Sequence, residues 1–256
     1  IELYLITSSI ETLMSLLLAE KNGGVNQPGK IKIVDWDISE FNFIGLYQQH
    51  LEYVNGCSDP RHFHEFVPSH RMPSGPTTGT AHTYGHDLLY AIDPAFDQAG
   101  YIKARDIGFI RTYRRFVQWL EEEIFCEDLV FQRLPSLRIH YPGYDSNGVM
   151  HVDSDFNHPK QEVNLWVPIT SSIRTASMMI ESECGRADYG PLELKYGQLA
   201  IFDSSLTHGN IVNEEGYTRM SFDLRVIPRR IYQDCRGNFS ATAIKEFSLG
   251  NYYDEF

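Results

Sequence analysis

Cysteine is scarce and scattered in this chain. Its cysteines lie far apart, and no two of them form a Cys-x-x-Cys pair; they are Cys57, Cys126, Cys184 and Cys235. That spacing argues against a zinc knuckle and against a disulfide framework. We therefore expect reduced thiols in a cytoplasmic protein.

Long hydrophobic runs are also missing. A membrane-spanning helix needs about 18 apolar residues in a row, whereas the nearest case, LMSLLLA at 13–19, is short and interrupted by Ser15. No positively charged segment precedes it, so we expect no signal peptide and no membrane partner.

Positive charge is in deficit. The chain of 256 residues has 22 Lys and Arg against 34 Asp and Glu, a formal net charge of −12. A nucleic-acid-binding surface needs clustered Lys and Arg, so this balance argues against such a partner. It leaves room for a small-molecule substrate, even an anionic one held by a local basic pocket, and it leaves a homodimer open.

The chain otherwise has an ordinary globular composition, with 42% apolar and 22% charged residues. We predict a single domain over 1–256 whose N-terminal half, 1–127, is helical. Helical periodicity and capping residues place helices at 8–23, 37–56 and 105–125, with a short strand at 30–36 and a long irregular loop at 57–100.

The pattern changes to period two after residue 128, which predicts strands. They follow one another without intervening helices, at 134–141, 162–169, 176–182, 197–202 and 218–227. A run of strands after a helical half indicates an α+β fold that is mostly β, with an antiparallel sandwich or barrel over 128–228 covered by helices. Residues 229–256 are predicted to form a peripheral C-terminal extension.

The segment HVDSD at 151–155 holds a candidate metal site. On a strand, His151 and Asp153 lie on the same face, because side chains alternate with period two. His208, just beyond a predicted strand, offers a third ligand. Two imidazoles and one carboxylate form a facial triad that leaves positions open on the metal, as in non-heme Fe(II) oxygenases. Zinc with a bound water is the alternative, and it suits a hydrolase.

Arg219 and Ser221, in TRMSFDLR, share one face of the last predicted strand. A guanidinium beside a hydroxyl can hold a carboxylate well, because it combines a planar fork with charge-assisted hydrogen bonds. An Arg at a barrel rim can also simply form a salt bridge. A zinc hydrolase gives no reason for this pair to follow His208 so closely.

Together, His-x-Asp, a distal His and Arg-x-Ser resemble the motifs of the Fe(II)/2-oxoglutarate-dependent dioxygenases. The resemblance covers about residues 134–228. It implies an enzyme with a double-stranded β-helix (jelly-roll) core that uses Fe(II), 2-oxoglutarate and O2 to hydroxylate, or otherwise oxidise, a C–H bond, with release of succinate and CO2. It also implies site residues: His151, Asp153 and His208 as iron ligands, with Arg219 and Ser221 on the distal carboxylate of 2-oxoglutarate.

The resemblance points to further site residues. Tyr141, in YPG, stands where a tyrosine lies near the cosubstrate in prolyl-hydroxylase-type relatives; a packed core tyrosine is the alternative. Asn164 can donate to 2-oxoglutarate if its face of the strand lines the barrel. Phe156 and His158 directly follow the ligands and are predicted substrate contacts. Arg225 is either a second cation for an anionic substrate or part of a surface salt bridge.

The substrate class stays open. The combination of motifs looks nearest to small-molecule hydroxylases, including proteins of aminocyclitol-antibiotic biosynthesis and hydroxylases of acidic sugars, so we predict a polar metabolite. A hydroxylase of protein residues, like the prolyl hydroxylases, is one alternative. A barrel of the same ancestry that binds a ligand without turnover is another, although the intact triad argues against it.

Overall fold

The structure is a computed structural model that describes residues 31–71, 79–97, 103–145, 149–241 and 245–256. The helix predicted over 8–23 lies outside these residues. Within them, no helix is long and apolar enough to cross a membrane.

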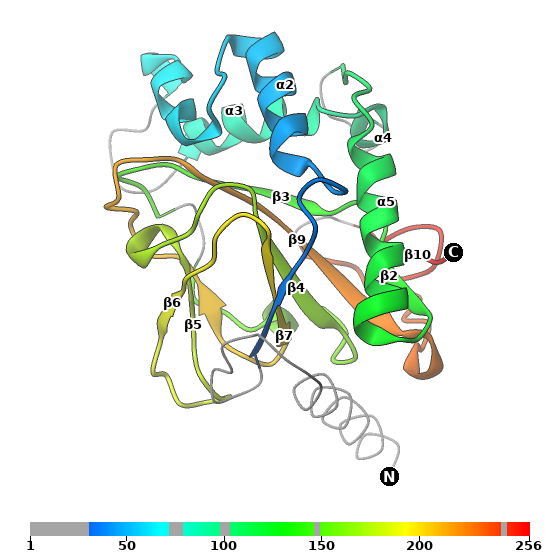
Figure 1. Cartoon of the computed structure of the whole chain (residues 1–256). Helices are drawn as coiled ribbons and strands as arrows, with labels where there is room; N and C mark the ends of the chain where they lie inside the picture. The colour runs from blue at the N-terminus through cyan, green and yellow to red at the C-terminus, as the bar shows by residue number, and fades with distance from the viewer. Residues whose placement is uncertain (1–30, 72–78, 98–102, 146–148, 242–244) are drawn as a thin grey trace.

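Two antiparallel sheets form the centre of the molecule (Figure 1). The order in the large sheet is β1 (Ile31–Asp35), β7 (Gln198–Asp203), β4 (Val163–Pro168), β9 (Arg219–Pro228), β2 (Leu129–Gln132) and β10 (Tyr253–Asp254), and β3 (Ser136–His140) also pairs with β9. The small sheet has the order β6 (Gly190–Leu192), β5 (Met178–Ile180) and β8 (His208–Gly209). The predicted mostly β fold with flanking helices is confirmed.

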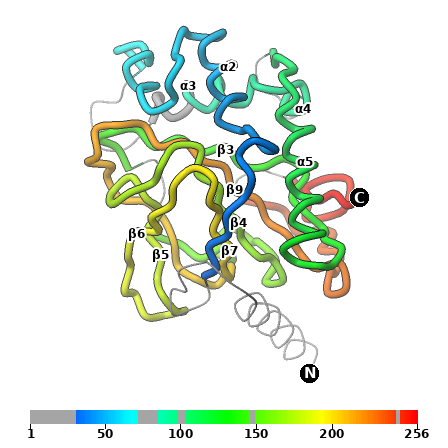
Figure 2. Tube along the Cα trace, in the orientation of Figure 1, coloured from blue at the N-terminus to red at the C-terminus, as the bar shows by residue number. Residues whose placement is uncertain are grey.

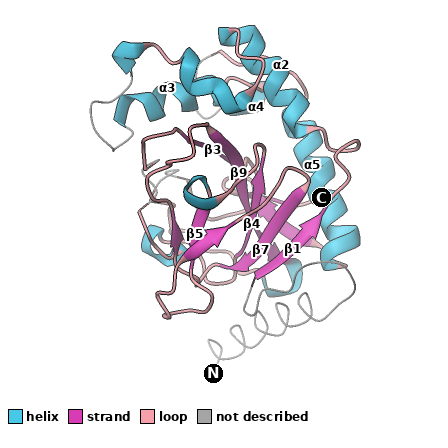
Figure 3. Ribbon diagram, turned by 60° about the vertical axis from the view of Figure 1, so that its left-hand side comes forward, coloured by secondary structure: helices cyan, strands magenta, loops and turns pink. Residues whose placement is uncertain are grey.

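Helices lie along one side of the large sheet, as Figures 1 and 3 show. They are α2 (Phe43–Asn55), α3 (Gly79–Tyr90), α4 (Pro94–Asp97) and α5 (Phe109–Trp119), and α5 continues as a π-helical segment over Leu120–Phe125. The helix predicted over 37–56 begins later than expected, at Phe43. The Asp37 carboxylate instead accepts hydrogen bonds from Ser39 in a turn, and Asn42 caps the helix by accepting from the Gly45 N–H.

The two faces of the large sheet differ in character, because its side chains alternate. The face under the helices is apolar, and Phe222 of β9 packs there against Phe43 and Phe109, with ring centroids at 4.9 and 6.1 Å. The opposite face carries the polar side chains of β9 and their cross-strand neighbours. They are Arg219 with His140, Ser221 with Arg138, and Arg225 with Asn164.

This second face packs against the small sheet. Trp166, Ala200 and Phe202 of the large sheet share one buried cluster with Met178, Ile180 and Leu192 of the small sheet. The space between the two sheets is therefore closed by apolar side chains at one place and lined by polar ones beside it.

One expectation about the periphery was wrong. The segment predicted as a long loop over 57–100 contains α3, α4 and the 3₁₀ helices Pro60–Phe66 and Ser69–Arg71. Two strands of the large sheet come from outside residues 128–228: β1, which matches the short strand predicted at 30–36, and β10, an edge strand in the C-terminal extension. That extension therefore belongs to the sheet, and Figure 2 traces its end beside α5.

Candidate functional site

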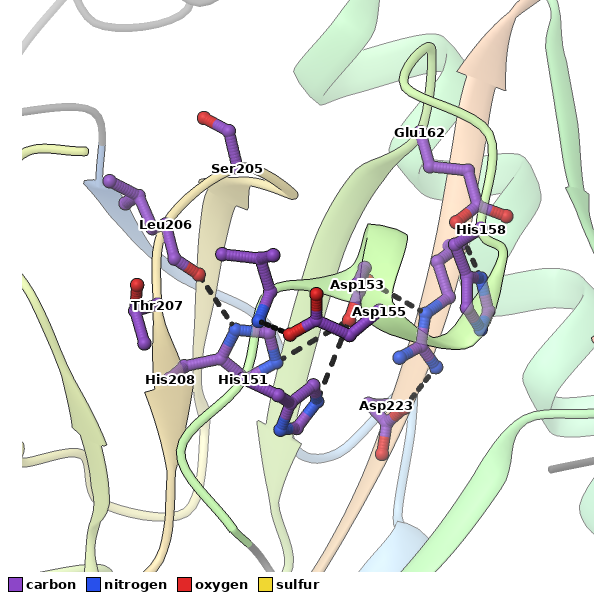
Figure 4. Close-up of polar contacts among 12 residues, drawn as sticks. His151, Asp153, Asp155, His158, Glu162, Ser205, Leu206, Thr207, His208 and Asp223 are labelled. Carbon is purple, nitrogen blue, oxygen red and sulfur yellow. Dashed lines mark hydrogen bonds and ion pairs between the residues drawn. The ribbon is translucent and has the colours of Figure 1, made fainter. Parts of the chain in front are cut away.

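His151 and His208 are brought together by a single antiparallel bridge. Each backbone N–H donates to the carbonyl of the other residue at 2.9 Å. This pairing places the imidazoles side by side, with ring centroids at 4.6 Å. Directly after His151 the chain turns into the 3₁₀ helix η4 (Asp153–Phe156), which directs the Asp153 carboxylate at both rings (Figure 4).

Backbone carbonyls fix the orientation of both imidazoles. Nδ1 of His151 lies 2.7 Å from the carbonyl of Val149, and Nδ1 of His208 lies 2.9 Å from the carbonyl of Leu206. A carbonyl only accepts, so each Nδ1 carries the proton and each neutral ring presents a lone pair at Nε2. Burial lowers the pKa of His208, and the Asp153 carboxylate opposes this shift only in part. The lowered pKa keeps the ring neutral.

The Asp153 carboxylate is buried but ionised. Burial alone would raise its pKa, but the charge of Arg225, together with electrostatic interactions with His208 and His158, outweighs that effect and holds the pKa below its usual range. Its Oδ2 lies 3.4 Å from Nε of Arg225. Its Oδ1 lies 3.8 Å from Nε2 of His151 and 3.6 Å from Nε2 of His208.

Three acceptor atoms thus converge with no proton between them. The ligand atoms of His151, Asp153 and His208 lie within 4.8 Å of one another, and Asp153 Oδ1 is buried without a hydrogen-bond partner among the described residues. Lone pairs that face each other repel unless a cation lies between them. The donor set of two imidazoles and one carboxylate therefore fits a divalent transition metal.

Arg219 is a buried cation, 2% exposed, on the face of the large sheet that is turned toward the small sheet. Its guanidinium donates only to neutral acceptors: the Ala176 carbonyl at 3.0 Å, Ser221 Oγ at 2.9 Å, Asn210 Oδ1 at 2.6 Å and His140 Nδ1 at 3.3 Å. Within the described part of the chain it forms no ion pair with a carboxylate. Burial, followed by the charge of Arg138, lowers its pKa to about 10. A buried charge without a counter-charge is costly, so the site fits an anionic ligand.

The neighbours of Arg219 orient its guanidinium and leave the Ser221 hydroxyl as a further donor for such a ligand. Nε2 of His140 lies 2.8 Å from the Tyr144 carbonyl, so Nε2 carries the proton and Nδ1 accepts from Arg219. Ser221 Oγ accepts from Arg219 and, at 3.1 Å, from Nε1 of Trp166. With both lone pairs used, the proton of the Ser221 hydroxyl is directed away from these two donors.

Asn164 lies next to the candidate metal ligand Asp153. Its cross-strand neighbours are Arg225 of β9 and Phe202 of β7, and the Phe202 ring packs on His208 at 5.2 Å. Asn164 is 3% exposed and helps to lower the pKa of Asp153, yet neither its Oδ1 nor its Nδ2 has a hydrogen-bond partner of regular geometry among the described residues. Buried amides without partners are costly, which again indicates a ligand.

No protein-family model matches the chain. A curated relative does: the streptomycin biosynthesis protein StrG of Streptomyces griseus is 33% identical over 145 residues, which cover 56% of this chain and 68% of StrG. The chain belongs to the StrG family.

Solved structures similar to this StrG-family chain include three proteins, two of which are described as non-heme. The α-ketoglutarate-dependent epimerase SnoN from nogalamycin biosynthesis has a TM-score of 0.48 and 13% identity, covering 96% of this chain and 99% of SnoN. The nickel complex of the monooxygenase ThoJ has a TM-score of 0.44 and 12% identity, covering 90% and 83%. CytC3 with Fe(II) and α-ketoglutarate has a TM-score of 0.32 and 19% identity, covering 40% and 45%. Scores this low support no argument about a shared reaction.

The structure of this StrG-family chain places most of the sequence-predicted residues in one site. The triad, Arg219, Ser221 and Asn164 all line the space between the two sheets. Phe156 lies at the edge of the triad, partly exposed, with its ring 4.8 Å from that of His151. This position suits a contact with substrate.

Three predicted residues are buried against other partners; for Tyr141 this is the alternative of a packed core tyrosine, and for Arg225 it is a salt bridge, although a buried one. Tyr141 is fully buried on the helix-covered face, where it stacks on Phe63 at 6.1 Å, because side chains alternate and His140 takes the inner face. Arg225 is not a free cation, since it pairs with Asp153 and Asp223. His158 is buried and bonded to Glu162, so it does not form part of an open rim.

Other residues of the site were not predicted. His140 directly precedes Tyr141, Asn210 lies two residues after His208, and both contact Arg219. His140 is the cross-strand partner of Arg219, and cross-strand partners share a face of the sheet. A correct pairing of the two strands would therefore have predicted His140. Glu162 and Tyr253 carry no local sequence signal, because their contacts depend on how distant segments pack.

Proposed function

We propose that this chain is an Fe(II)- and 2-oxoglutarate-dependent oxygenase with a double-stranded β-helix core, which hydroxylates a polar small molecule and releases succinate and CO2. One observation carries the proposal. The buried Arg219, without an anionic partner among the described residues, lies on β9, the strand whose Arg225 contacts Asp153, one of three residues with converging metal-ligand atoms. A metal that binds one end of a dicarboxylate and a guanidinium that binds the other would use both features at once.

Each side chain has a defined task in this proposal. His151, Asp153 and His208 hold the metal through Nε2, Oδ1 and Nε2, which their hydrogen bonds and charges leave as acceptors. Arg219 and Ser221 donate to the distal carboxylate of 2-oxoglutarate, with charge-assisted hydrogen bonds. Asn164, whose amide has no hydrogen-bond partner of regular geometry among the described residues, donates to the cosubstrate near the metal.

The bound iron and cosubstrate would supply the oxidising power, because oxidative decarboxylation of 2-oxoglutarate drives attack on an unactivated C–H bond. The protein orients the cosubstrate and keeps bulk water away. Phe202 covers His208 and Trp166 packs over Arg219, with the guanidinium carbon 5.5 Å from the ring centroid. These apolar walls strengthen the electrostatic contacts inside.

We extend the proposal to the substrate. StrG is named for streptomycin biosynthesis, so we propose that this chain acts in the biosynthesis of an antibiotic or a related metabolite. Phe156, beside His151 and partly exposed, would contact that substrate.

The test is anaerobic addition of Fe(II) and 2-oxoglutarate to the purified protein, with the visible spectrum recorded. We expect the weak charge-transfer band of the iron chelate, absent when succinate replaces 2-oxoglutarate. Tight zinc retention without that band would instead indicate a hydrolase. Succinate release in air, stimulated by a panel of polar metabolites, would then identify the substrate.

A further inference from the structure

Glu162 is a fully buried carboxylate directly behind the candidate metal centre. Its Oε2 accepts from Nδ1 of His158 at 2.7 Å, and its Oε1 accepts from the hydroxyl of Tyr253 at 2.5 Å. Within the described residues, neither Lys nor Arg forms an ion pair with it. These two hydrogen bonds therefore carry the stabilisation of the buried charge.

His158 connects this carboxylate to Asp153. Its backbone N–H donates to the Asp153 carbonyl at 3.3 Å, and ligand-type atoms of Asp153, His158 and Glu162 lie within 4.8 Å of one another. Figure 4 shows His158 and Glu162 on one side of Asp153, with His151 and His208 on the other. The imidazole of His158 also contributes to the lowered pKa of Asp153.

The C-terminal segment 245–256 holds Tyr253 in place at the end of the hydrogen-bonded series that is farthest from Asp153. Tyr253 lies in β10, which pairs with β2, and the next residue, Asp254, forms an ion pair with Arg114 of α5 at 2.5 Å. The rings of Phe247 and Tyr252 pack on His158 at 4.9 and 5.8 Å. Burial, followed by the Glu162 charge, raises the pKa of Tyr253, so its hydroxyl keeps its proton and donates to Glu162.

A second metal at Asp153, His158 and Glu162 is the competing explanation for this cluster. Two contacts oppose it. The guanidinium of Arg225 already lies 3.4 Å from Asp153 Oδ2, and a cation placed beside it would be repelled. His158 and Glu162 are already hydrogen-bonded to each other, so their donor and acceptor atoms are in use.

We propose that Tyr253, Glu162 and His158 form a positioning chain, through which the C-terminal segment 245–256 fixes the Asp153 carboxylate for the metal. The inference rests on the proposed function, since it needs the metal at His151, Asp153 and His208. Groups that orient a ligand from behind contribute to metal affinity, because they reduce the freedom the ligand loses on binding. The three are positioning residues, acting only through Asp153.

The experiment compares Tyr253→Phe and Glu162→Gln with Tyr232→Phe as the matched control. Tyr232 belongs to the same aromatic cluster, with its ring 5.9 Å from that of Tyr253, but its hydroxyl makes no hydrogen bond to Glu162. Co(II) is titrated anaerobically into the metal-free proteins, and its visible ligand-field bands report both affinity and ligand geometry. The melting temperature of each metal-free protein is measured in parallel.

We expect the Kd for Co(II) to rise roughly 10- to 100-fold in Glu162→Gln and about 10-fold in Tyr253→Phe, with altered band intensities. Tyr232→Phe should bind like the wild type, with one Co(II) per chain in every protein. Unchanged affinity and spectra in both test variants would overturn the positioning chain while leaving the proposed metal centre intact. Two Co(II) ions per wild-type chain would overturn it in favour of the second metal. If the wild type binds no Co(II), the proposed function and the inference both fail.

Discussion

Arg225 contacts only one of the two carboxylate oxygens of Asp153. Nε of Arg225 lies 3.4 Å from Oδ2 of Asp153, while Oδ1 of the same group faces the two imidazoles and has no hydrogen-bond partner among the described residues. Arg225 also pairs with Asp223, which pairs in turn with Arg138. A line of alternating charges therefore runs from the candidate metal ligand along the inner face of the large sheet. It keeps Asp153 ionised and leaves one of its oxygens available.

Replacement of Arg225 should weaken both the fold and the metal site. In Arg225→Gln, Asp153 and Asp223 lose the cation between them, so the free energy of unfolding of the metal-free protein should fall by about 3–5 kcal/mol. Metal affinity should fall roughly 10- to 100-fold. Urea unfolding and Co(II) titration measure the two effects. Arg230→Gln is the control, because Arg230 pairs with Glu127 at a half-exposed position and its loss should cost less than about 1 kcal/mol.

Replacement of Arg219 should separate cosubstrate binding from metal binding. In Arg219→Gln we expect the Kd for 2-oxoglutarate to rise roughly 10- to 100-fold, because a charge-assisted hydrogen bond contributes about 1.5–3 kcal/mol. The Kd for Co(II) should stay within about twofold, since Arg219 has no contact with the triad in the described structure. Calorimetric titration of each ligand checks both values. An equal loss of both affinities would assign Arg219 a structural role.

The Arg-x-Ser pair could be predicted because Arg219 and Ser221 are two positions apart on the strand β9 and so share a face. Alternation does not explain the metal triad, because Asp153 lies in the 3₁₀ helix η4 and not on a strand, and His151 meets His208 through a bridge between distant segments. An alternation argument places the wrong side chain in the site when the expected residue is one position away along the strand. Tyr141 was a candidate for the site, with a packed core tyrosine as the alternative, and the structure places its neighbour His140 on the inner face instead.

Helix α3 was not predicted, because the close packing of the helix that its glycine permits is not visible in the sequence. Its glycines suggested a loop, but a Cβ at Gly85 would lie 2.1 Å from the hydroxyl oxygen of Tyr141. Gly85 therefore permits the close approach of the helix to β3 and does not break the helix. Contacts of this kind depend on residues far apart in sequence, as do those of Glu162 with Tyr253, and a single sequence does not reveal them.

Asn164 offers a variant in which stability and ligand binding change independently. In Asn164→Leu the unpartnered amide is replaced by an apolar group of similar size, so the free energy of unfolding of the metal-free protein should stay unchanged or rise by about 1 kcal/mol. The Kd for 2-oxoglutarate should rise about 10-fold, because one donor is lost. Thermal unfolding with and without the cosubstrate measures both.

Asn213 is the matched control for that variant. It is fully buried and its amide is fully used, donating to the carbonyls of His140 and Tyr217 and accepting from the Glu215 N–H. Asn213→Leu should therefore destabilise the protein by about 2 kcal/mol or more. Equal destabilisation in the two variants would show that the Asn164 amide is bonded within the protein.

His140 should make stability depend on pH. Burial, followed by the charge of Arg219, lowers its pKa to about 3, against 6.5 in an unfolded chain. Between these values the unfolded chain binds a proton that the folded protein does not, so this contribution is fully present above pH 6.5 and is lost as the pH falls toward 3. From pH 7 to pH 5 the loss is about 2 kcal/mol. His50 and His208 also have lowered pKa values, so the test is the difference between wild type and His140→Gln in urea unfolding at several pH values. We expect the variant to lose less stability on acidification by about that amount, and the exposed His62→Gln to follow the wild type; parallel curves for wild type and His140→Gln would show that His140 is protonated as readily in the folded protein as in the unfolded chain.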